Sequence, residues 1–179
     1  MCFLYRGVAA ALVLLSLGIF TAPGIAGYPE ESDSDPLHES IVPSTQDLAK
    51  DAAFAREQNI PLILVFSAED CDYCKLLEQE ILDPMYISRD YDDKAVIRRV
   101  MIDSHLGLLD FAGTAIDADA FAKRLGVKVT PTVLFVDTHG KELAPRLLGV
   151  NTIEMYSAYM DQAIDLSYQE MQNRRTLID

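Results

Sequence analysis

Two kinds of hydrophobic pattern alternate along this chain, and each predicts a type of secondary structure. Continuous apolar runs at 62–66 and 133–136 are typical of strands that are buried on both faces of a sheet. The less regular runs at 95–103 and 142–148 predict two further strands, and the second should form a hairpin with 133–136 across the turn at 137–140. The pattern therefore indicates a central β-sheet.

Apolar residues at helical spacing predict the first helices around that sheet. One helix, capped by Ser44 or Thr45, should run to about Gln58. Its buried face is expected to consist of Leu48, Ala52, Phe54 and Ala55. A second helix over 75–82 should stop at Asp83-Pro84, because proline disfavours helical backbone at the residue before it.

The second half of the chain continues the alternation of helices and strands. Residues 85–92 are expected to be irregular or to form a short helix, and residues 105–115 to be a connection that contains two glycines. Asp117 can cap a helix over 117–125, and a final helix is predicted over 152–173. Strands that alternate with helices in this way predict an α/β fold.

A pair of cysteines stands where the first strand meets the second helix. Cys71-Asp72-Tyr73-Cys74 follows the apolar run, so the first sulfur should lie near the unpaired N–H groups and the positive dipole end of the helix. Such surroundings lower the pKa of a thiol and favour the nucleophilic thiolate. The second sulfur lies one turn further on, close enough to form a disulfide. The motif therefore indicates thiol–disulfide exchange.

Two other uses of a C-x-x-C motif compete with that interpretation. A zinc site would need two more cysteine or histidine ligands, but the only other cysteine is Cys2, and His38, His105 and His139 stand singly. A purely structural disulfide would close a short loop, which removes little entropy from the unfolded chain. The sequence predicts no metal ligands and no cofactor apart from the Cys71–Cys74 disulfide, and both alternatives stay open.

The N-terminal residues have the pattern of a secretory signal peptide. Residues 1–27 combine a short start, an apolar stretch and small residues at the expected cleavage point. An uncleaved anchor is the alternative, although the apolar stretch is short beside the roughly 20 residues of a spanning helix. Cleavage would remove Cys2 and leave Cys71 and Cys74 in an oxidising compartment. We therefore expect a periplasmic or secreted protein.

Composition indicates how the chain after residue 27 is organised and which classes of partner it excludes. Residues 28–43 are rich in acids, serine and proline and predict a flexible acidic linker, after which residues 44–179 should form one domain. The net charge of −13 argues against nucleic acid and anionic membrane surfaces as partners. No later apolar segment is long enough to cross a bilayer, so no membrane insertion is expected after signal cleavage.

Several motifs in combination resemble the thioredoxin fold. They are the C-x-x-C after an apolar strand, Gly126-Val127 at a helix end, Val129-Thr130-Pro131-Thr132 before an apolar strand, and Gly140 and Gly149 in the hairpin. Over about 45–171 the chain resembles a secreted bacterial thioredoxin-like protein. The resemblance implies a central mixed β-sheet flanked by helices, with an N-terminal helix and modest insertions.

The resemblance also assigns roles to individual residues. It implies that Cys71 is the attacking thiol, that Cys74 is the resolving thiol, and that Thr130-Pro131 is a cis-proline element against the cysteine pair. Because proline donates no backbone hydrogen bond, such a loop can leave a neighbouring backbone edge open to an extended peptide. A trans proline at the start of a strand is the alternative. Asp72 and Tyr73 complete the expected substrate-binding residues.

The chain departs from thioredoxins close to the motif. It has no tryptophan, and Asp70 stands where thioredoxins carry one, while Asp72-Tyr73 replaces their glycine-proline pair. Val65 occupies the strand position of a buried acid that helps to deprotonate the resolving thiol, which puts that proton route in question. Glu69 and the two aspartates should also disfavour a thiolate on Cys71.

Three hypotheses for the function follow. The first is a periplasmic thiol–disulfide oxidoreductase, with reduction favoured because acids near Cys71 disfavour the stabilised thiolate of a strong oxidant. It would act on protein disulfides or thiols through a mixed disulfide and would need a membrane-bound or soluble electron donor. The second is a protein that holds Cu(I) or Zn(II) on the two thiolates. The third is a client-binding protein without redox activity.

Overall fold

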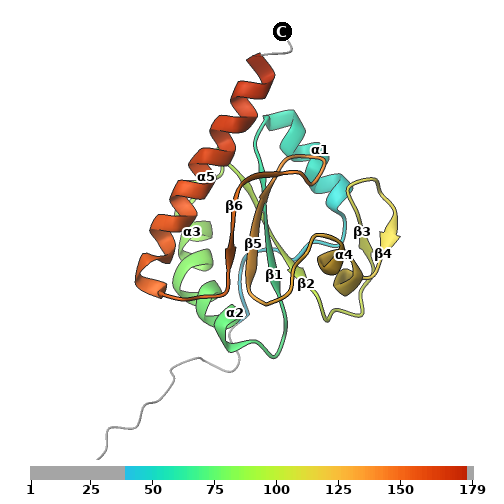
Figure 1. Ribbon diagram of the computed structural model, residues 1–179, viewed down its shortest axis with the longest axis vertical. Helices are drawn as coiled ribbons and strands as arrows, with labels where there is room; N and C mark the ends of the chain where they lie inside the picture. The colour runs from blue at the N-terminus through green and yellow to red at the C-terminus, as the bar shows by residue number, and fades with distance from the viewer. Residues whose placement is uncertain (1–38, 177–179) are drawn as a thin grey trace, which may run out of the picture. The chain divides into compact units, whose positions relative to one another are not determined.

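A mixed sheet of strands in the order β2, β1, β5, β6 forms the centre of the computed structural model, which describes residues 39–176 (Figure 1). β1 (Leu62–Ser67) is parallel to β2 (Val96–Met101) and antiparallel to β5 (Thr132–Val136). The predicted hairpin of β5 and β6 (Glu142–Leu148) is also present. All residues of β1 and β5 are buried, as their continuous apolar runs predict.

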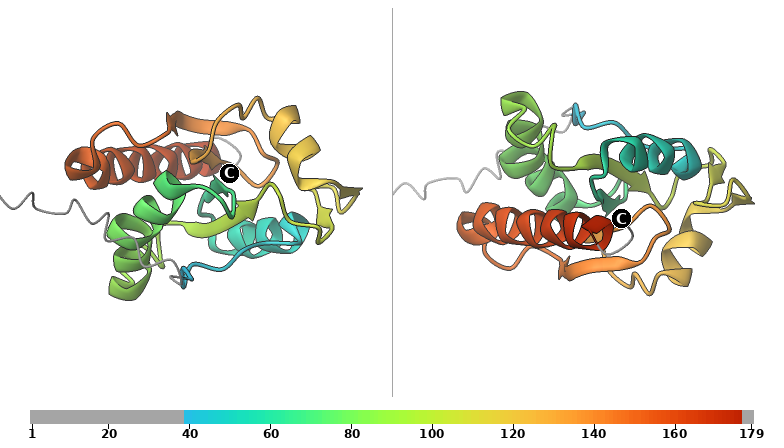
Figure 2. Two further views of the ribbon diagram at one scale, coloured as in Figure 1. Left: turned by 90° about the horizontal axis from the view of Figure 1, so that it is seen from below. Right: turned by 90° about the horizontal axis from the view of Figure 1, so that it is seen from above.

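Helices cover both faces of this sheet (Figures 1 and 2). α1 (Leu48–Gln58) and α4 (Ala118–Arg124) pack on one face. α2 (Asp72–Leu77), α3 (Asp83–Ser88) and α5 (Ile153–Thr176) pack on the other. The predicted class, a mixed sheet flanked by helices with an N-terminal helix, is therefore confirmed.

Each face of the sheet buries its own cluster of apolar side chains. Phe66 and Phe121 are the largest members of the cluster under α1 and α4. Phe135 and Met160 belong to the cluster under the other helices. Among the described residues, no helix is both long and apolar enough to cross a membrane.

The helix that follows the cysteines is longer than predicted. α2 continues into η1 (Glu78–Leu82), a π-helical segment, and then into α3, so the predicted stop at Asp83-Pro84 is wrong. Asp83 keeps helical backbone angles, with φ −68° and ψ −45°. Pro84 stands in the first turn of α3, where a helix tolerates the missing N–H of proline.

The first helix begins later than predicted and buries a narrower face. Its N-cap is Asp47, not Ser44 or Thr45, and the Asp47 carboxylate accepts a hydrogen bond from the N–H of Lys50 at 2.9 Å. Phe54, predicted to be buried, is 51% exposed. The buried side consists of Leu48, Ala52 and Ala55, whose i, i+4, i+7 spacing leaves Phe54 on another face.

The domain also begins before residue 44. Val42 is fully buried in the cluster on the α2 face, and the hydroxyl of Ser40 donates a hydrogen bond to Asp83 at 2.6 Å. The N–H of Arg99 in β2 donates to the carbonyl of Pro43 at 2.9 Å. Residues 40–43 therefore pack along the sheet edge rather than extending the linker. The rest of that linker to residue 38, and the predicted signal peptide at 1–27, lie outside the described residues.

The connection predicted at 105–115 contains a small hairpin of its own. β3 (Leu108–Leu109) pairs with β4 (Ala115–Ile116). At its turn, the Asp110 carboxylate accepts the N–H groups of Ala112 and Thr114 and forms an ion pair with Arg124 at 2.9 Å. The Thr114 N–H first, and then Arg124, hold the pKa of Asp110 below its usual value. These hydrogen bonds fix the conformation of the turn between β3 and β4.

Candidate active site

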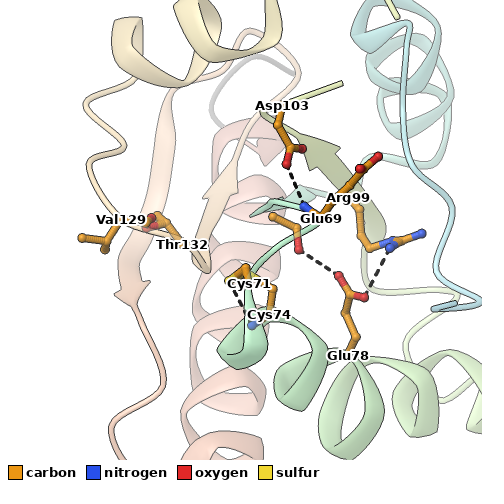
Figure 3. The surroundings of a disulfide bond; sticks show 9 residues. Glu69, Cys71, Cys74, Glu78, Arg99, Asp103, Val129 and Thr132 are labelled. Atoms are coloured by element: carbon orange, nitrogen blue, oxygen red, sulfur yellow. Dashed lines mark hydrogen bonds and ion pairs between the residues drawn. A yellow bond between two sulfur atoms is a disulfide. The ribbon is translucent and has the colours of Figure 1, made fainter. Parts of the chain in front are cut away.

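Cys71 and Cys74 form a disulfide at the start of α2, with their Cα atoms 5.2 Å apart (Figure 3). Cys71 is the N-cap residue, and its sulfur accepts a hydrogen bond from the N–H of Cys74 at 3.2 Å. Cys71 is half-buried, whereas Cys74 is 1% exposed. An incoming group can therefore reach the first sulfur more easily than the second.

The Thr130-Pro131 loop lies at the same end of the sheet as the disulfide. Thr132 pairs in register with Phe66, the residue before the last of β1, so Pro131 stands next to the point where β1 leads into the cysteine loop. The Thr130–Pro131 peptide bond is cis, and Pro131 is buried. The fold thus brings together two motifs that are far apart in the sequence.

The residues between and before the cysteines face outward. Tyr73 is 60% exposed, and Asp72, like Glu69 and Asp70, is exposed. The N–H of Glu69 donates to the carboxylate of Asp103 at 2.8 Å, which ties the cysteine loop to the end of β2 (Figure 3). The surface around Cys71 therefore carries an aromatic ring and several acids.

A cleft of about 360 Å³ opens beside the Pro131 loop. It lies between the end of β6 and the start of α5, and its lining includes Leu148, Gly149 and Tyr159. The N–H of Gly149 donates to the carbonyl of Pro131 at 2.8 Å, so the cleft begins next to the proline. This cleft was not predicted, because its walls come from two elements that meet only in the folded chain.

An ion pair that the sequence analysis did not identify involves Glu78, one helical turn beyond Cys74 (Figure 3). Glu78 is 5% exposed, and its carboxylate accepts a hydrogen bond from the hydroxyl of Ser67 at 2.9 Å. The guanidinium of Arg99 is paired with the same carboxylate at 3.3 Å. Glu78 follows Cys74 at helical spacing, so a charged residue on the buried face of the helix was the available signal.

Val65, which stands where thioredoxins carry a buried acid, is fully buried and apolar. Its partner in register on β2 is Arg99, so these two side chains share one face of the sheet. The charged groups on this face are therefore supplied by β2 and the cysteine-bearing helix rather than by β1.

Across residues 39–176, no group of three or more histidine, cysteine, aspartate or glutamate side chains is placed to hold a metal ion. In the structure the two sulfurs of the motif are bonded to each other.

Comparison with solved structures finds several thioredoxins. Thioredoxin O2 from Arabidopsis thaliana is 21% identical with a TM-score of 0.47, over 69% of this chain and 94% of that protein. Mitochondrial thioredoxin 3 from Saccharomyces cerevisiae is 17% identical with a TM-score of 0.46, over 69% of this chain and 93% of that one. A thioredoxin-fold protein from Helicobacter pylori is 18% identical with a TM-score of 0.41, over 68% and 87% of the two chains.

Family assignment rests on the sequence, since all three TM-scores lie below 0.5. No curated protein matches the chain. The family model described as the thioredoxin-like domain matches residues 48–164, which is more than half of the chain and includes both the cysteine pair and Thr130-Pro131. The chain therefore belongs to the thioredoxin-like domain family.

Proposed function

We propose that this protein is a thiol–disulfide oxidoreductase that works through Cys71 and Cys74. The observation that carries the proposal is the position of the disulfide. The half-buried sulfur of Cys71 caps a helix, the sulfur of Cys74 is buried behind it, and the Pro131 loop lies at the same end of the sheet. This arrangement separates a sulfur that meets substrate from one that acts only within the protein.

The first step in the reducing direction is attack by the Cys71 thiolate on one sulfur of a substrate disulfide. A mixed disulfide forms, and the other substrate sulfur leaves as a thiolate that takes up a proton. The positive dipole end of the helix and the Cys74 N–H, which contacts the Cys71 sulfur, favour the thiolate needed for this attack.

The second step is attack by Cys74 on the sulfur of Cys71. The Cys74 thiol first loses its proton, the Cys71–Cys74 bond then forms, and the second substrate sulfur leaves as a thiolate. Two electrons pass from the protein to the substrate in the complete cycle. A membrane-bound or soluble electron donor must afterwards reduce Cys71–Cys74, and the same steps in reverse would insert a disulfide.

Protein disulfides are the proposed substrates. Tyr73, 60% exposed, and Asp72 lie next to the attacking sulfur, and the cleft beside Gly149 extends the surface beyond Pro131. An extended segment of the substrate could lie along the Thr130-Pro131 backbone, where proline presents no N–H of its own. The exposed acids near Cys71 disfavour a strongly stabilised thiolate, which supports reduction over oxidation.

We also propose that the protein acts in the periplasm or after secretion. The support is the signal-peptide pattern at 1–27 and the single cysteine pair that would remain after cleavage. Fractionation of cells that express the full chain, with sequencing of the mature N-terminus, tests this. Retention of the intact N-terminus in the cytoplasm would overturn the proposed location.

The activity is tested with the reduced protein in a Cys2→Ser background, where Cys71 and Cys74 are the only thiols. Cys74→Ser should accumulate a mixed disulfide with a protein substrate, and Cys71→Ser should not. Equilibration with graded glutathione ratios then gives the potential, with a midpoint near about −270 mV expected for a reductase and near about −120 mV for an oxidant.

The alternatives make different predictions in the same experiment. If neither variant forms a mixed disulfide and the wild type reduces no substrate, the oxidoreductase proposal fails. Stoichiometric Cu(I) or Zn(II) that survives dialysis would then favour metal handling. Client binding that persists after both cysteines are replaced by serine would favour a protein without redox activity.

A further inference from the structure

Release of the substrate requires the Cys74 thiol to lose a proton, and this thiol has little contact with solvent. Cys74 is 1% exposed, on the buried face of α2. Val65, in β1 on the sheet face that α2 covers, is apolar and provides no proton acceptor. A buried thiol is harder to ionise than an exposed one, because burial disfavours the charged form. A proton acceptor inside the protein would therefore accelerate this step.

Glu78 stands one helical turn beyond Cys74. The N–H of Glu78 donates to the carbonyl of Cys74, so the two residues span a regular turn, which places their Cβ atoms about 5–6 Å apart on one face. Figure 3 shows Cys74 and Glu78 on the same helix, with the Glu78 carboxylate directed toward Arg99. Both side chains are at least nine-tenths buried.

The Glu78 carboxylate is held in place from two other elements. Ser67, the last residue of β1, donates to one oxygen at 2.9 Å, and Arg99 of β2 is paired with the other at 3.3 Å. The guanidinium of Arg99 also donates to the carbonyl of Val42 at 2.8 Å and to that of Ser40 at 3.4 Å. These contacts hold the carboxylate in one position between η1, β1 and β2.

The other buried carboxylates of the described chain lie elsewhere. Asp83 accepts hydrogen bonds from Ser40 and from the N–H of Ile41, further along the helix from Cys74. Asp110 belongs to the β3–β4 turn, and Asp137 to the β5–β6 turn. Glu78 is thus the buried carboxylate nearest in the helix to the resolving cysteine.

We propose that Glu78 is the proton acceptor for Cys74 when the mixed disulfide is resolved, with Ser67 and Arg99 as positioning residues. This inference rests on the proposed function. The proton moves from the Cys74 sulfur to the Glu78 carboxylate, the Cys74 thiolate attacks the Cys71 sulfur, and the bond from Cys71 to the substrate sulfur breaks. The substrate leaves as a thiolate, and Glu78 then returns its proton to solvent.

Stopped-flow mixing of the reduced protein, in the Cys2→Ser background, with one equivalent of a chromogenic aromatic disulfide tests this inference. The first thiol released reports attack by Cys71, and the second reports resolution by Cys74. In Glu78→Gln, the second phase should slow about 100-fold near neutral pH, the lower end of the usual general-base effect. The first phase should be unchanged.

The pH dependence separates proton transfer from a structural effect. The second phase of Glu78→Gln should rise with pH, and its ratio to that of the wild type should shrink as the pH approaches the range in which the buried thiol ionises unaided. Glu80→Gln, which removes the same charge from an exposed position of η1, should match the wild type at every pH. If Glu78→Gln folds poorly, Glu78→Gln/Arg99→Met removes both charges together and should show the same pH-dependent loss.

Two results would overturn the inference. One is a second phase that is unchanged in the Glu78 variants, and the other is a second phase that is slowed by the same factor at all pH values. Failure of the proposed function has a different signature, because Cys74→Ser would then trap no protein substrate, whatever the two phases with the aromatic disulfide show.

Discussion

The two faces of the central sheet bury different chemistry. Under α1 and α4 the core is apolar and aromatic, with Phe66 and Phe111 each placing a ring centroid 6.1 Å from that of Phe121. The Arg98–Asp51 ion pair, whose side chains are 23% and 13% exposed, lies at the border of this core. Under α2, α3 and α5 the apolar core also contains the Glu78–Arg99 ion pair and the hydroxyl of Ser67. The disulfide lies at the edge of this second face.

The two faces are therefore expected to contribute differently to stability and to the disulfide chemistry. Burial of apolar area stabilises the fold directly, whereas a buried ion pair often contributes no more than apolar residues of similar volume would. An ion pair beside Cys74 therefore needs a reason other than stability, and proton transfer provides one. We expect changes on the aromatic face to alter stability, and changes at Glu78 to alter the rate of disulfide exchange.

The largest expected effect on stability is on the aromatic face. Phe121 is fully buried, so Phe121→Ala should lower the free energy of unfolding by about 3–5 kcal/mol. Chemical denaturation followed by circular dichroism measures this. Phe54→Ala, at an exposed phenylalanine of α1, is the matched control and should change it by less than about 0.5 kcal/mol. If the folded Phe121→Ala variant resolved the mixed disulfide more slowly than the wild type, the expectation that the aromatic face affects only stability would be wrong.

A double-mutant cycle of Glu78→Gln and Arg99→Met measures the buried pair. Because both side chains are largely buried and in contact, we expect a coupling free energy of about 1–3 kcal/mol. The same cycle on Asp110 and Arg124, whose guanidinium is half exposed, should give a smaller value. A coupling free energy at Glu78–Arg99 no larger than that at Asp110–Arg124 would contradict the expected effect of burying both partners.

Helix capping on the aromatic face should have a smaller effect. Asp47→Ala removes the acceptor of the Lys50 N–H and should lower the free energy of unfolding by about 1 kcal/mol. Asp117→Ala, which removes the cap of α4, should have a similar effect. Both variants should exchange disulfides at the wild-type rate, and a change in rate without a change in stability would contradict this expectation.

The smallest expected effect is the acid sensitivity of Asp110. Because its folded pKa lies below the ordinary value of 3.8, its stabilising contribution is complete above that pH and is lost as the pH falls through the lower folded value. The difference in stability between wild type and Asp110→Asn should therefore shrink on acidification below about pH 4. Thermal unfolding at several pH values measures this, with Asp93→Asn as an exposed control. A difference that is independent of pH would contradict the ion-pair interpretation.

Much of the fold could be predicted because burial constrains local composition. A strand buried on both faces must be apolar throughout, so β1 and β5 were recognisable from short runs alone. The cap of α4 was predicted from Asp117 because capping depends on a side chain and the N–H groups just after it.

The predicted helix boundaries and buried faces were wrong where contacts with a neighbouring element outweighed the local sequence preference. Asp83-Pro84 was predicted to end a helix, but η1 and α3 continue through it because Pro84 stands in a first turn. Ser44 and Thr45 resemble caps, yet they lie beside Arg99 at the edge of β2, and Asp47 caps the helix instead. Phe54 has an apolar side chain, but it lies outside the buried face of α1 and stays 51% exposed.

The sequence by itself determined that Cys71 and Cys74 open a helix after a buried strand, because both features depend on adjacent residues. The tertiary structure alone decided what surrounds them. The pairing of β5 with β1 places Pro131 at the end of the sheet where the disulfide lies. Glu78 meets Ser67 and Arg99 only because helix packing and the parallel pairing of β1 with β2 bring three elements together. Such contacts depend on strand register and packing, which short sequence patterns do not encode.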